Sequence, residues 1–219
     1  MNYFVAGTDT GIGKTLIACA LLHGLAAQGK RVVGMKPVAA GCDDEGRNED
    51  ALKLCAASNV QAAYQQINPY CFLPAIAPHL AAQQVGVEIQ LARIVDAYRE
   101  LAAQAEAVIV EGAGGLLVPL NKTQDGADLA LELGIPIILV VGIRLGCLNH
   151  ALLTVEAIAA RGLTLAAWVA NVVEADMVMG EENIAALQQR IVAPLLGIVP
   201  FLNHADARVA AEKLDLARL

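Results

Sequence analysis

Short apolar runs alternate along the chain with longer segments in which apolar residues recur at three- and four-residue spacing. The short runs predict strands at Tyr3–Ala6, Arg31–Met35, Ala107–Val110, Pro136–Val141, Leu165–Ala170 and Leu196–Val199. The periodic segments predict helices at Lys14–Gln28, Asp50–Ala57, Leu91–Gln104, Ala127–Leu133, Asn149–Ala160 and Glu181–Ile191. Strands without polar alternation, separated by helices, indicate a three-layer α/β fold, in which helices cover both faces of a mostly parallel central sheet.

Nothing in the chain marks a boundary between domains. Glycines follow three of the predicted helices, at Gly29, Gly134 and Gly162, but no repeat, low-complexity tract or Pro/Ser-rich linker interrupts the pattern. We therefore expect residues 1–219 to form a single domain. In a sheet of this kind ligands bind at the carboxyl ends of the strands, so the residues that follow each strand are the candidates for chemistry.

Composition excludes several classes of protein. The formal charge is −7 and 4% of residues are aromatic, which disfavours nucleic acid as a partner. The longest nearly unbroken apolar stretch, Ile135–Ile143, is far shorter than the roughly 20 residues of a membrane span. Because Met1–Val5 does not have the pattern of a secretory signal, we expect a cytoplasmic protein that does not bind membranes.

The five cysteines are Cys19, Cys42, Cys55, Cys71 and Cys147. Their number is odd, their spacing is wide and irregular, and no pair forms a Cys-x-x-Cys motif. The sequence therefore predicts neither a structural zinc site nor a disulfide framework.

A phosphate-binding loop follows the first predicted strand. Residues Gly7–Thr15 read GTDTGIGKT and lead into an apolar helix, which is the order of strand, loop and helix that the motif requires. The glycines allow backbone N–H groups to face phosphate oxygens, while Lys14 reaches the outer phosphates and the Thr15 hydroxyl binds magnesium. Gly7 lies one position earlier than the usual spacing. The alternative, a plain glycine turn before a helix, does not explain why all three features coincide.

One residue inside this loop narrows the class of protein. Partition and septum-positioning ATPases carry a second lysine at the position that Asp9 occupies here, so an ATPase of that type is disfavoured. A carboxylate would repel a bound phosphate unless it met a positive group. Asp9 is therefore expected either to point outward as a turn-forming residue or to meet an amine or the metal.

The second strand ends at Lys36, and the polar segment after it contains Asp50. Lys36 precedes the rigid Pro37, so it is expected to direct a fixed positive charge toward the phosphate loop; the alternative is a solvated surface lysine. Asp50 opens a predicted helix, where the commoner role is that of an N-cap.

A carboxylate also follows the strand Ala107–Val110. Glu111 begins the sequence EGAGG, and its position after a β-branched strand is where a phosphate-loop enzyme holds magnesium, although an acidic turn is the alternative. Because magnesium prefers oxygen ligands, Thr15, Asp50 and Glu111 form a plausible set together with phosphate oxygens.

Two later strands end in polar residues. The segment Arg144–Asn149 lies between a strand and a helix, so its backbone N–H groups are candidates for binding a carboxylate. Asn171 ends the next strand with an amide that is able both to donate to and to accept from an adenine edge. For Asn149 and Asn171, helix capping is an equally good interpretation.

Together these motifs closely resemble the dethiobiotin synthetase family over nearly the whole chain. The resemblance rests on Gly7–Thr10 with Gly13–Thr15, Lys36–Val38, Asn68–Tyr70, Pro78–His79, Glu111–Gly115, Leu145–His150 and Trp168–Asn171. The long form of the phosphate loop is typical of that family. The resemblance implies a P-loop NTPase fold and a homodimeric, magnesium-dependent enzyme of biotin biosynthesis. It would convert carbon dioxide, ATP and 7,8-diaminononanoate to dethiobiotin, ADP and phosphate.

The resemblance also implies roles for individual residues. Lys36 and Lys14 would be catalytic, and Thr15, Asp50 and Glu111 would hold magnesium. The implied nucleotide contacts are Gly11, Ile12, Gly13, Lys14, Thr15, Leu16, Asp50, Glu111, Gly112, Ala113, Gly114, Asn171, Pro200, Phe201 and Leu202. The implied substrate contacts are Thr10, Ala40, Gly146, Cys147 and Asn149, the last three reached from across a dimer interface. Gly11 and Ala40 stand where some relatives have an acidic residue and a serine. Asp206 receives no role.

Two other classes of protein are disfavoured. A cobyrinate-type amidotransferase shares such a loop but needs a glutaminase domain, for which the chain is too short. A nucleotide switch that docks on a partner or a membrane conflicts with Asp9 and with the lack of an amphipathic basic tail. Cys147 has no activating neighbour in the sequence, and the expected chemistry needs no enzyme-bound intermediate.

Overall fold

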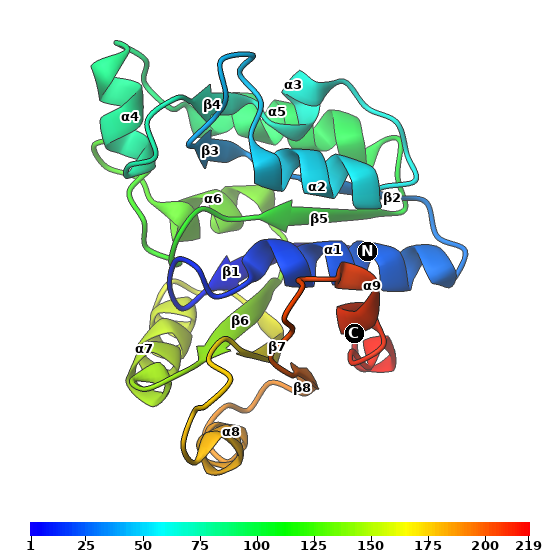
Figure 1. The fold of residues 1–219 in the computed structure, drawn as a ribbon. Coiled ribbons are helices and arrows are strands. Elements are labelled where there is room, and N and C mark those ends of the chain that lie inside the picture. Colours follow the sequence, from blue (N-terminus) through cyan, green and yellow to red (C-terminus); the bar gives the residue numbers. More distant parts are fainter.

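The computed structural model describes all residues from Met1 to Leu219 and contains a central parallel sheet. Its strands are β1 (Asn2–Gly7), β2 (Val32–Met35), β5 (Ala107–Glu111), β6 (Ile137–Ile143), β7 (Leu165–Val172) and β8 (Leu195–Val199). They lie in the order β2-β5-β1-β6-β7-β8, and every neighbouring pair is parallel (Figure 1). All the carboxyl ends therefore meet at one edge of the sheet, with β1 near the middle.

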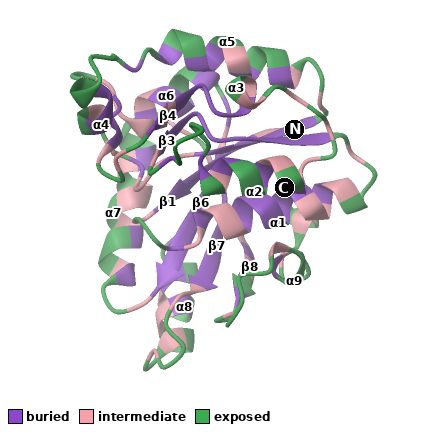
Figure 2. Ribbon diagram, turned by 45° about the horizontal axis from the view of Figure 1, so that its top comes forward, coloured by how far each residue is buried: buried purple, intermediate pink, exposed green.

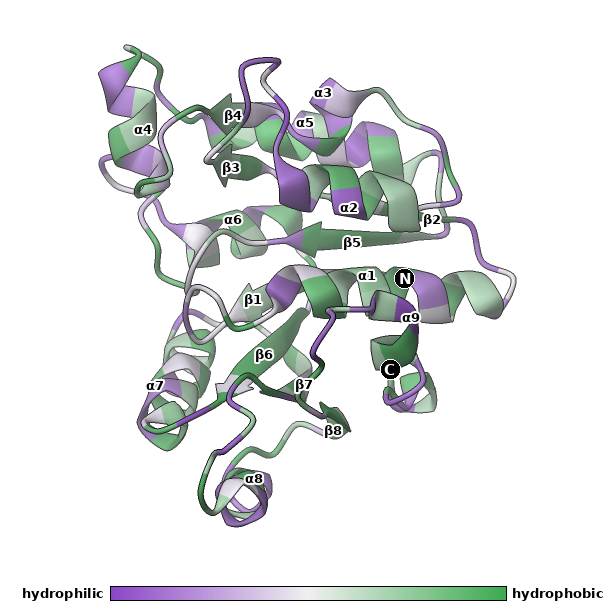
Figure 3. Cartoon of the chain, in the orientation of Figure 1, coloured by the Kyte–Doolittle hydropathy of each residue, from purple (hydrophilic) through white to green (hydrophobic).

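Helices cover both faces of this sheet. One face is covered by α1 (Lys14–Ala27), α2 (Glu49–Ala57) and α9 (Ala207–Ala211), and the other by α5 (Leu91–Ala102), α6 (Gly126–Leu133), α7 (Cys147–Ala160) and α8 (Gly180–Gln188). Successive strand residues face opposite sides, so Val5 packs toward α1 while Phe4 packs toward α5 and α6. The strands are buried and apolar, whereas the helices are polar on their outer faces (Figures 2 and 3). None of the helices has both the length and the apolar character needed to cross a membrane.

The six predicted strands and six predicted helices are confirmed, and their observed ends differ from the predicted ones by up to three residues. The elements that the pattern missed are β3 (Val38–Ala40), β4 (Tyr70–Phe72), α3 (Tyr64–Ile67), α4 (Pro78–Gln84), α9 and a terminal 3₁₀ turn, Leu216–Arg218. Each is too short to show a period. Strands β3 and β4 pair with each other as a separate two-stranded sheet beside the carboxyl end of β2.

This small sheet corrects one expectation from the sequence. Cys42 follows β3 and Cys71 lies in β4, and the two form a disulfide although 29 positions separate them. Cysteines that are far apart in the sequence lie close together in space here because β3 pairs with β4. Cys19, Cys55 and Cys147 are free thiols.

Candidate active site

The phosphate loop joins the end of β1 to the start of α1 and folds back on its own lysine. Gly11 and Gly13 have φ angles of 72° and 85°, a conformation that glycine adopts without a steric penalty. Lys14 Nζ donates to the carbonyl oxygen of Asp9 at 2.7 Å. A Cβ atom at Gly7 would lie 2.8 Å from Lys14 Cδ, so the early glycine provides the space in which the lysine side chain lies.

Asp9 meets a positive group and also shapes a turn. Its Oδ1 accepts from the backbone N–H of Thr10 at 2.7 Å, and its Oδ2 pairs with the guanidinium of Arg144, which follows β6. The sequence left open whether Asp9 forms a turn or meets a positive group. In the structure it does both, and the positive group is an arginine. The pair ties the phosphate loop to the junction between β6 and α7.

A cluster of one lysine and two carboxylates lies behind the loop. Lys36 Nζ donates to Glu111 Oε1 at 2.6 Å and to Asp50 Oδ2 at 3.1 Å. The Thr15 hydroxyl also donates to Glu111 Oε1, at 2.8 Å. The side chains of Lys36 and Glu111 are 7% and 1% exposed, so the interpretations of a solvated lysine and an acidic turn are both wrong.

The charges in this cluster hold one another in the ionised state. Burial alone would lower the pKa of Lys36, but Glu111 and Asp50 outweigh burial, so the pKa is raised. Burial would raise the pKa of Asp50, but Lys36 outweighs it and the pKa is lowered. Lys14 has no such close carboxylate partner, and burial together with repulsion from Lys36 lowers its pKa to about 8. Lys14 is therefore the cation that gains most from an added anion.

Asp50 is not the N-cap of its helix. Asn48 caps α2, because its Oδ1 accepts from the backbone N–H groups of Asp50 at 3.0 Å and Ala51 at 3.3 Å. Asp50 lies two residues after this cap, as the second residue of α2, and its carboxylate accepts from Lys36 instead. Asn48 was not among the predicted site residues, although an Asn two positions before an acidic helix start is itself a capping signal.

The cluster has the donor set of a magnesium site. Glu111 Oε2 is buried and has no hydrogen-bond partner, and it lies on the same carboxyl group that accepts from Thr15 and Lys36. No group of three or more His, Cys, Asp or Glu side chains with metal-binding geometry exists in the structure. Two carboxylates and a hydroxyl suit a hard cation that takes its remaining ligands from water and phosphate, so the residues fit magnesium and not zinc.

Asn171 braces the phosphate loop from β7. It is 4% exposed, and its Nδ2 donates to the carbonyl oxygen of Ile12 at 2.8 Å, so it does not cap a helix. A Cβ at Gly13 would overlap this amide, which adds to the reason for glycine at that position. The other predicted nucleotide contacts lie at the same edge of the sheet: Leu16 in α1, Gly112, Ala113 and Gly114 after β5, and Pro200, Phe201 and Leu202 after β8.

The predicted carboxylate pocket lies at the start of α7. Gly146 is the N-cap residue, with φ 90°, and Cys147 is buried in the first turn. Asn149 lies inside the helix and is exposed, so its capping interpretation is wrong. No hydrogen bond joins these residues, or Thr10 and Ala40, to the lysine cluster.

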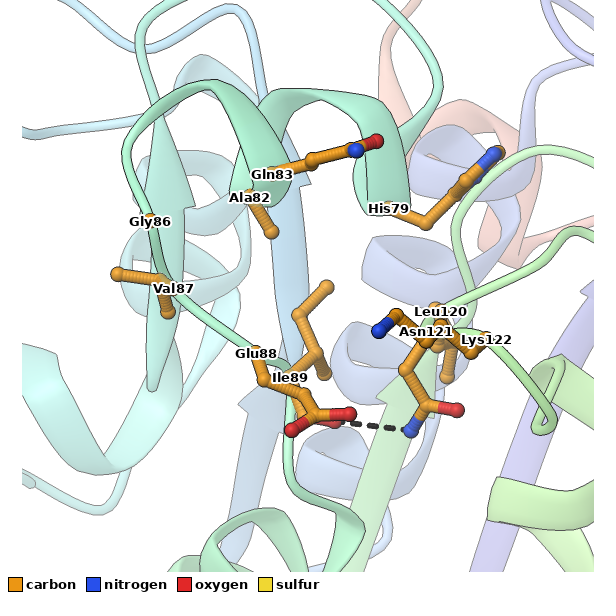
Figure 4. Close-up of a pocket in the computed structure, with 10 residues that line it drawn as sticks. All are labelled: His79, Ala82, Gln83, Gly86, Val87, Glu88, Ile89, Leu120, Asn121 and Lys122. Atoms are coloured by element: carbon orange, nitrogen blue, oxygen red, sulfur yellow. Dashed lines mark hydrogen bonds between the residues drawn. The ribbon is translucent and has the colours of Figure 1, made fainter.

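Two clefts lie near these elements. One, of about 430 Å³, is formed by Thr8–Thr10 of the phosphate loop, Gly115–Pro119 and one side of α7. The other, of about 390 Å³, lies under α4, and His79 and Lys122 line it together with the amide of Asn121, which donates to Ile89 (Figure 4). The second cleft contains no residue of the predicted site.

Comparison with known proteins gives consistent matches over nearly the full length. The AAA domain family matches residues 1–208. The chain is 58% identical to the ATP-dependent dethiobiotin synthetase BioD of Aromatoleum aromaticum over 217 residues, covering 98% of this chain and 96% of that protein. It is 54% identical to the protein of the same name from Nitrosospira multiformis, covering 100% and 96%.

Solved structures with the same fold are much less similar in sequence. The MinD cell division protein of Aquifex aeolicus matches with a TM-score of 0.56 at 14% identity, covering 95% of this chain and 86% of that one. A ParA family ATPase from Chlorobium tepidum matches with a TM-score of 0.54 at 15% identity, covering 99% and 94%. At this level of identity the comparison shows the fold alone, which is that of the P-loop NTPases.

Proposed function

The chain belongs to the ATP-dependent dethiobiotin synthetase family, and from that membership we propose that it closes the ureido ring of dethiobiotin, a ligase reaction of biotin biosynthesis. Its substrates would be 7,8-diaminononanoate, carbon dioxide and ATP, and its products dethiobiotin, ADP and phosphate. The observation that carries the proposal is the hydrogen-bonded cluster of Lys36, Glu111, Asp50 and Thr15 behind the phosphate loop, in which Lys36 and Glu111 are buried. We further propose that the 219 residues act as one domain in the cytoplasm.

The reaction has three steps, and none of them forms a covalent bond to the protein. One amine of the diamine captures carbon dioxide as a carbamate and releases a proton. The carbamate oxygen attacks the γ-phosphorus of ATP, and ADP leaves. The second amine then attacks the carbon of the carbamic-phosphoric anhydride and loses a proton, and phosphate leaves as the ring closes. Each step moves negative charge among oxygens, so fixed cations and correct alignment supply the catalysis.

Lys14 and Lys36 are the cations that this scheme needs. Lys14 lies in the loop that would surround the phosphates, and Lys36 reaches the same edge of the sheet from the end of β2. In the ATP-bound enzyme Lys14 would exchange the Asp9 carbonyl for phosphate oxygens. Lys36 would hold the carbamate and the transferring phosphoryl group against each other.

We propose that Thr15, Asp50 and Glu111 hold magnesium. The partnerless Glu111 Oε2 supports this, because a buried carboxylate oxygen without a donor is stabilised by a nearby cation. When bound, the ion would neutralise charge on the phosphate oxygens. The chain's contribution is the set of oxygen atoms and their orientation. The Asn48 cap fixes the start of α2, from which Asp50 reaches the same Lys36 amine as Glu111.

We propose that the enzyme is a homodimer with a composite substrate site. Exposed apolar side chains support this. Leu117 and Leu153, which line the cleft beside the phosphate loop, are 47% and 58% exposed, and Leu145, just before α7, is 93% exposed. A partner packed there would bring its own Gly146, Cys147 and Asn149 toward the diamine's carboxylate. Thr10 and Ala40 would contact the reacting end of the diamine.

A nucleotide-driven switch is the competing class, since MinD and ParA share the fold. The ion pair between Asp9 and Arg144 supports the enzyme, because it occupies the place where the switch proteins carry a second lysine.

Phosphate release measured with and without the diamine tests the proposal. The purified chain with ATP, magnesium and bicarbonate should release phosphate only when 7,8-diaminononanoate is added, because phosphoryl transfer needs the carbamate. Phosphate release at the same rate without the diamine would indicate an ATPase and would contradict the proposed function.

A further inference from the structure

Two buried asparagines support the site from outside it, because neither is among its proposed ligands or catalytic groups. Asn48 is 7% exposed and Asn68 is 4% exposed. Burying an amide is unfavourable unless its donors and acceptors are satisfied, so the partners of these two side chains show what they stabilise. Both belong to segments that the chemistry does not use directly, the loop before α2 and the turn after α3.

Asn68 holds the backbone of Lys36. Its Nδ2 donates to the carbonyl oxygen of Lys36 at 2.6 Å and to that of Tyr70 at 3.0 Å. The backbone N–H of Lys36 donates in turn to the carbonyl of Ile67 at 2.8 Å. Both polar groups of the Lys36 main chain are therefore fixed by the segment that ends α3.

Asn48 holds the start of the helix that carries Asp50. Beyond capping α2, its Nδ2 points toward the carbonyl oxygens of Ala40 at 3.5 Å and Gly41 at 3.4 Å, which attaches the helix start to the end of β3. The Asp50 side chain is 38% exposed and accepts a hydrogen bond from Lys36 Nζ at 3.1 Å. The position of its carboxylate depends on the position of the helix.

Tyr64 connects the two asparagines through its hydroxyl. The hydroxyl donates to Asn68 Oδ1 at 3.2 Å and accepts from the backbone N–H of Asn48 at 2.8 Å. That N–H has no other acceptor in the structure. Asn48, Tyr64 and Asn68 therefore form a chain of hydrogen bonds, the 48–64–68 relay. One end of it is bonded to the Lys36 carbonyl and the other to the Asp50 backbone, so the bond from Lys36 Nζ to Asp50 closes a ring.

We propose that Tyr64 is a positioning residue, which through the 48–64–68 relay sets the place of the Asp50 carboxylate relative to Lys36. The inference rests on the proposed function, in which Asp50 holds magnesium and Lys36 acts on the phosphoryl group. Hydrogen-bonding partners behind a metal-binding carboxylate orient it, and their loss weakens metal binding although they do not touch the ion. The relay links the two groups by hydrogen bonds that are partly shielded from solvent, where a polar group has fewer alternative partners than in water.

The test compares Tyr64→Phe with Tyr98→Phe. Both changes remove one hydroxyl from a partly buried tyrosine; the Tyr98 hydroxyl accepts from Asn2 Nδ2 at 2.7 Å and has no link to the site. Affinity for Mn²⁺ in the presence of a non-hydrolysable ATP analogue is measured for each, at a temperature where circular dichroism shows the variant folded. Tyr64→Phe should weaken Mn²⁺ binding roughly 10-fold, while Tyr98→Phe should leave it unchanged.

A double variant shows whether Tyr64 acts through Asp50. In an Asp50→Asn background, Tyr64→Phe should cause little further loss of Mn²⁺ affinity, because the carboxylate that the relay orients is gone. Equal affinities for the two tyrosine variants, or a full additional loss in the Asp50→Asn background, would overturn the proposal. If Tyr64→Phe does not fold, Asn68→Ser breaks the next link and should weaken Mn²⁺ binding in the same direction; unchanged affinity would again overturn it.

The metal titration keeps this inference separable from the proposed function. Mn²⁺ affinity is measured without turnover, so the relay stands if Tyr64→Phe weakens binding even though the wild-type protein makes no dethiobiotin. If the wild-type protein makes dethiobiotin and Tyr64→Phe binds Mn²⁺ as tightly as Tyr98→Phe, the relay is wrong and the function stands.

Discussion

At the scale of single residues, the ion pair of Lys36 and Glu111 is the most constrained feature of the site. Removing two charges from water costs free energy, which their attraction offsets only when both are present and well aligned. The pair is 2.6 Å long and almost closed to solvent, and Glu111 Oε2 still has no donor. The sequence predicted both residues from their place after a strand, but it predicted neither their contact nor their burial, because each depends on how β2 and β5 pair.

Replacing Lys36 with methionine should therefore affect stability as well as turnover. Lys36→Met leaves Glu111 buried and unpaired, which should lower the free energy of unfolding by about 3–5 kcal/mol. Adding Glu111→Gln removes the second charge and should recover most of that loss without restoring turnover. Urea unfolding and initial rates measure the two effects. Equal stability losses in the single and double variants would contradict the pairing, and wild-type turnover in either would contradict the role of Lys36.

Glu111→Gln alone tests the metal. An amide is a poorer ligand for a hard dication than a carboxylate, so the magnesium concentration that gives half the maximal rate should rise. Binding of metal-free ATP should change less, since the backbone of the phosphate loop is untouched. In a parallel titration of Mn²⁺ binding, which needs no turnover, Lys36→Met serves as the comparison because it removes a charge from the same pair without removing a ligand. An unchanged magnesium profile in Glu111→Gln would mean that Glu111 does not bind the ion.

At the scale of elements, the hydrophobic pattern predicted the strands and helices that are long enough to show a period. It could not predict β3 and β4, which have three residues each and pair only with one another. That pairing brings Cys42 beside Cys71 and places Asn68 under Lys36. The motif Asn68–Tyr70 was visible in the sequence, but its bond to Lys36 was not, because that partner is 32 positions away and belongs to the end of β2.

Two strand glycines allow the support of the phosphate loop to be tested. A Cβ at Gly142 in β6 would lie 2.8 Å from Ile12 Cβ in the loop, whereas a Cβ at Gly34 in β2 would lie 2.8 Å from Leu54 Cβ in α2. Gly142→Ala and Gly34→Ala should each cost about 1–3 kcal/mol of stability through overpacking. Only Gly142→Ala should also weaken ATP binding, which calorimetry measures. Equal ATP affinities in the two variants would show that β6 does not set the loop's position.

At the scale of the whole molecule, one architecture serves proteins of different function. MinD and ParA share the sheet and its helices with this chain at 14% and 15% identity. Fold therefore says little about chemistry, which depends on the side chains at the strand ends. Here those side chains include the ion pair of Asp9 and Arg144, and the family match extends over nearly the whole chain.

The proposed composite site predicts rescue between inactive subunits. Lys14→Ala and Gly146→Phe should each be inactive alone, because one lacks the phosphate lysine and the other blocks the carboxylate pocket. Mixed and allowed to exchange, they should regain roughly a quarter of wild-type activity, since half the dimers are hybrids with one intact site of two. Gly146→Ala is the control for backbone strain. Alanine must adopt the same φ of 90° as phenylalanine would, but its side chain is too small to block the pocket. Confirmed exchange without recovered activity would place the pocket within one chain.

The central claim, that this chain builds the ureido ring from carbon dioxide at the expense of ATP, is tested most directly by following labelled carbon. The purified enzyme would be incubated with ¹³C-bicarbonate, magnesium, ATP and 7,8-diaminononanoate, and the products would be measured by mass spectrometry and phosphate assay. The wild-type enzyme should form dethiobiotin that carries one ¹³C in the ring, in equal amount to ADP and phosphate, and Lys36→Met should form none. ADP formation without labelled dethiobiotin would contradict the central claim.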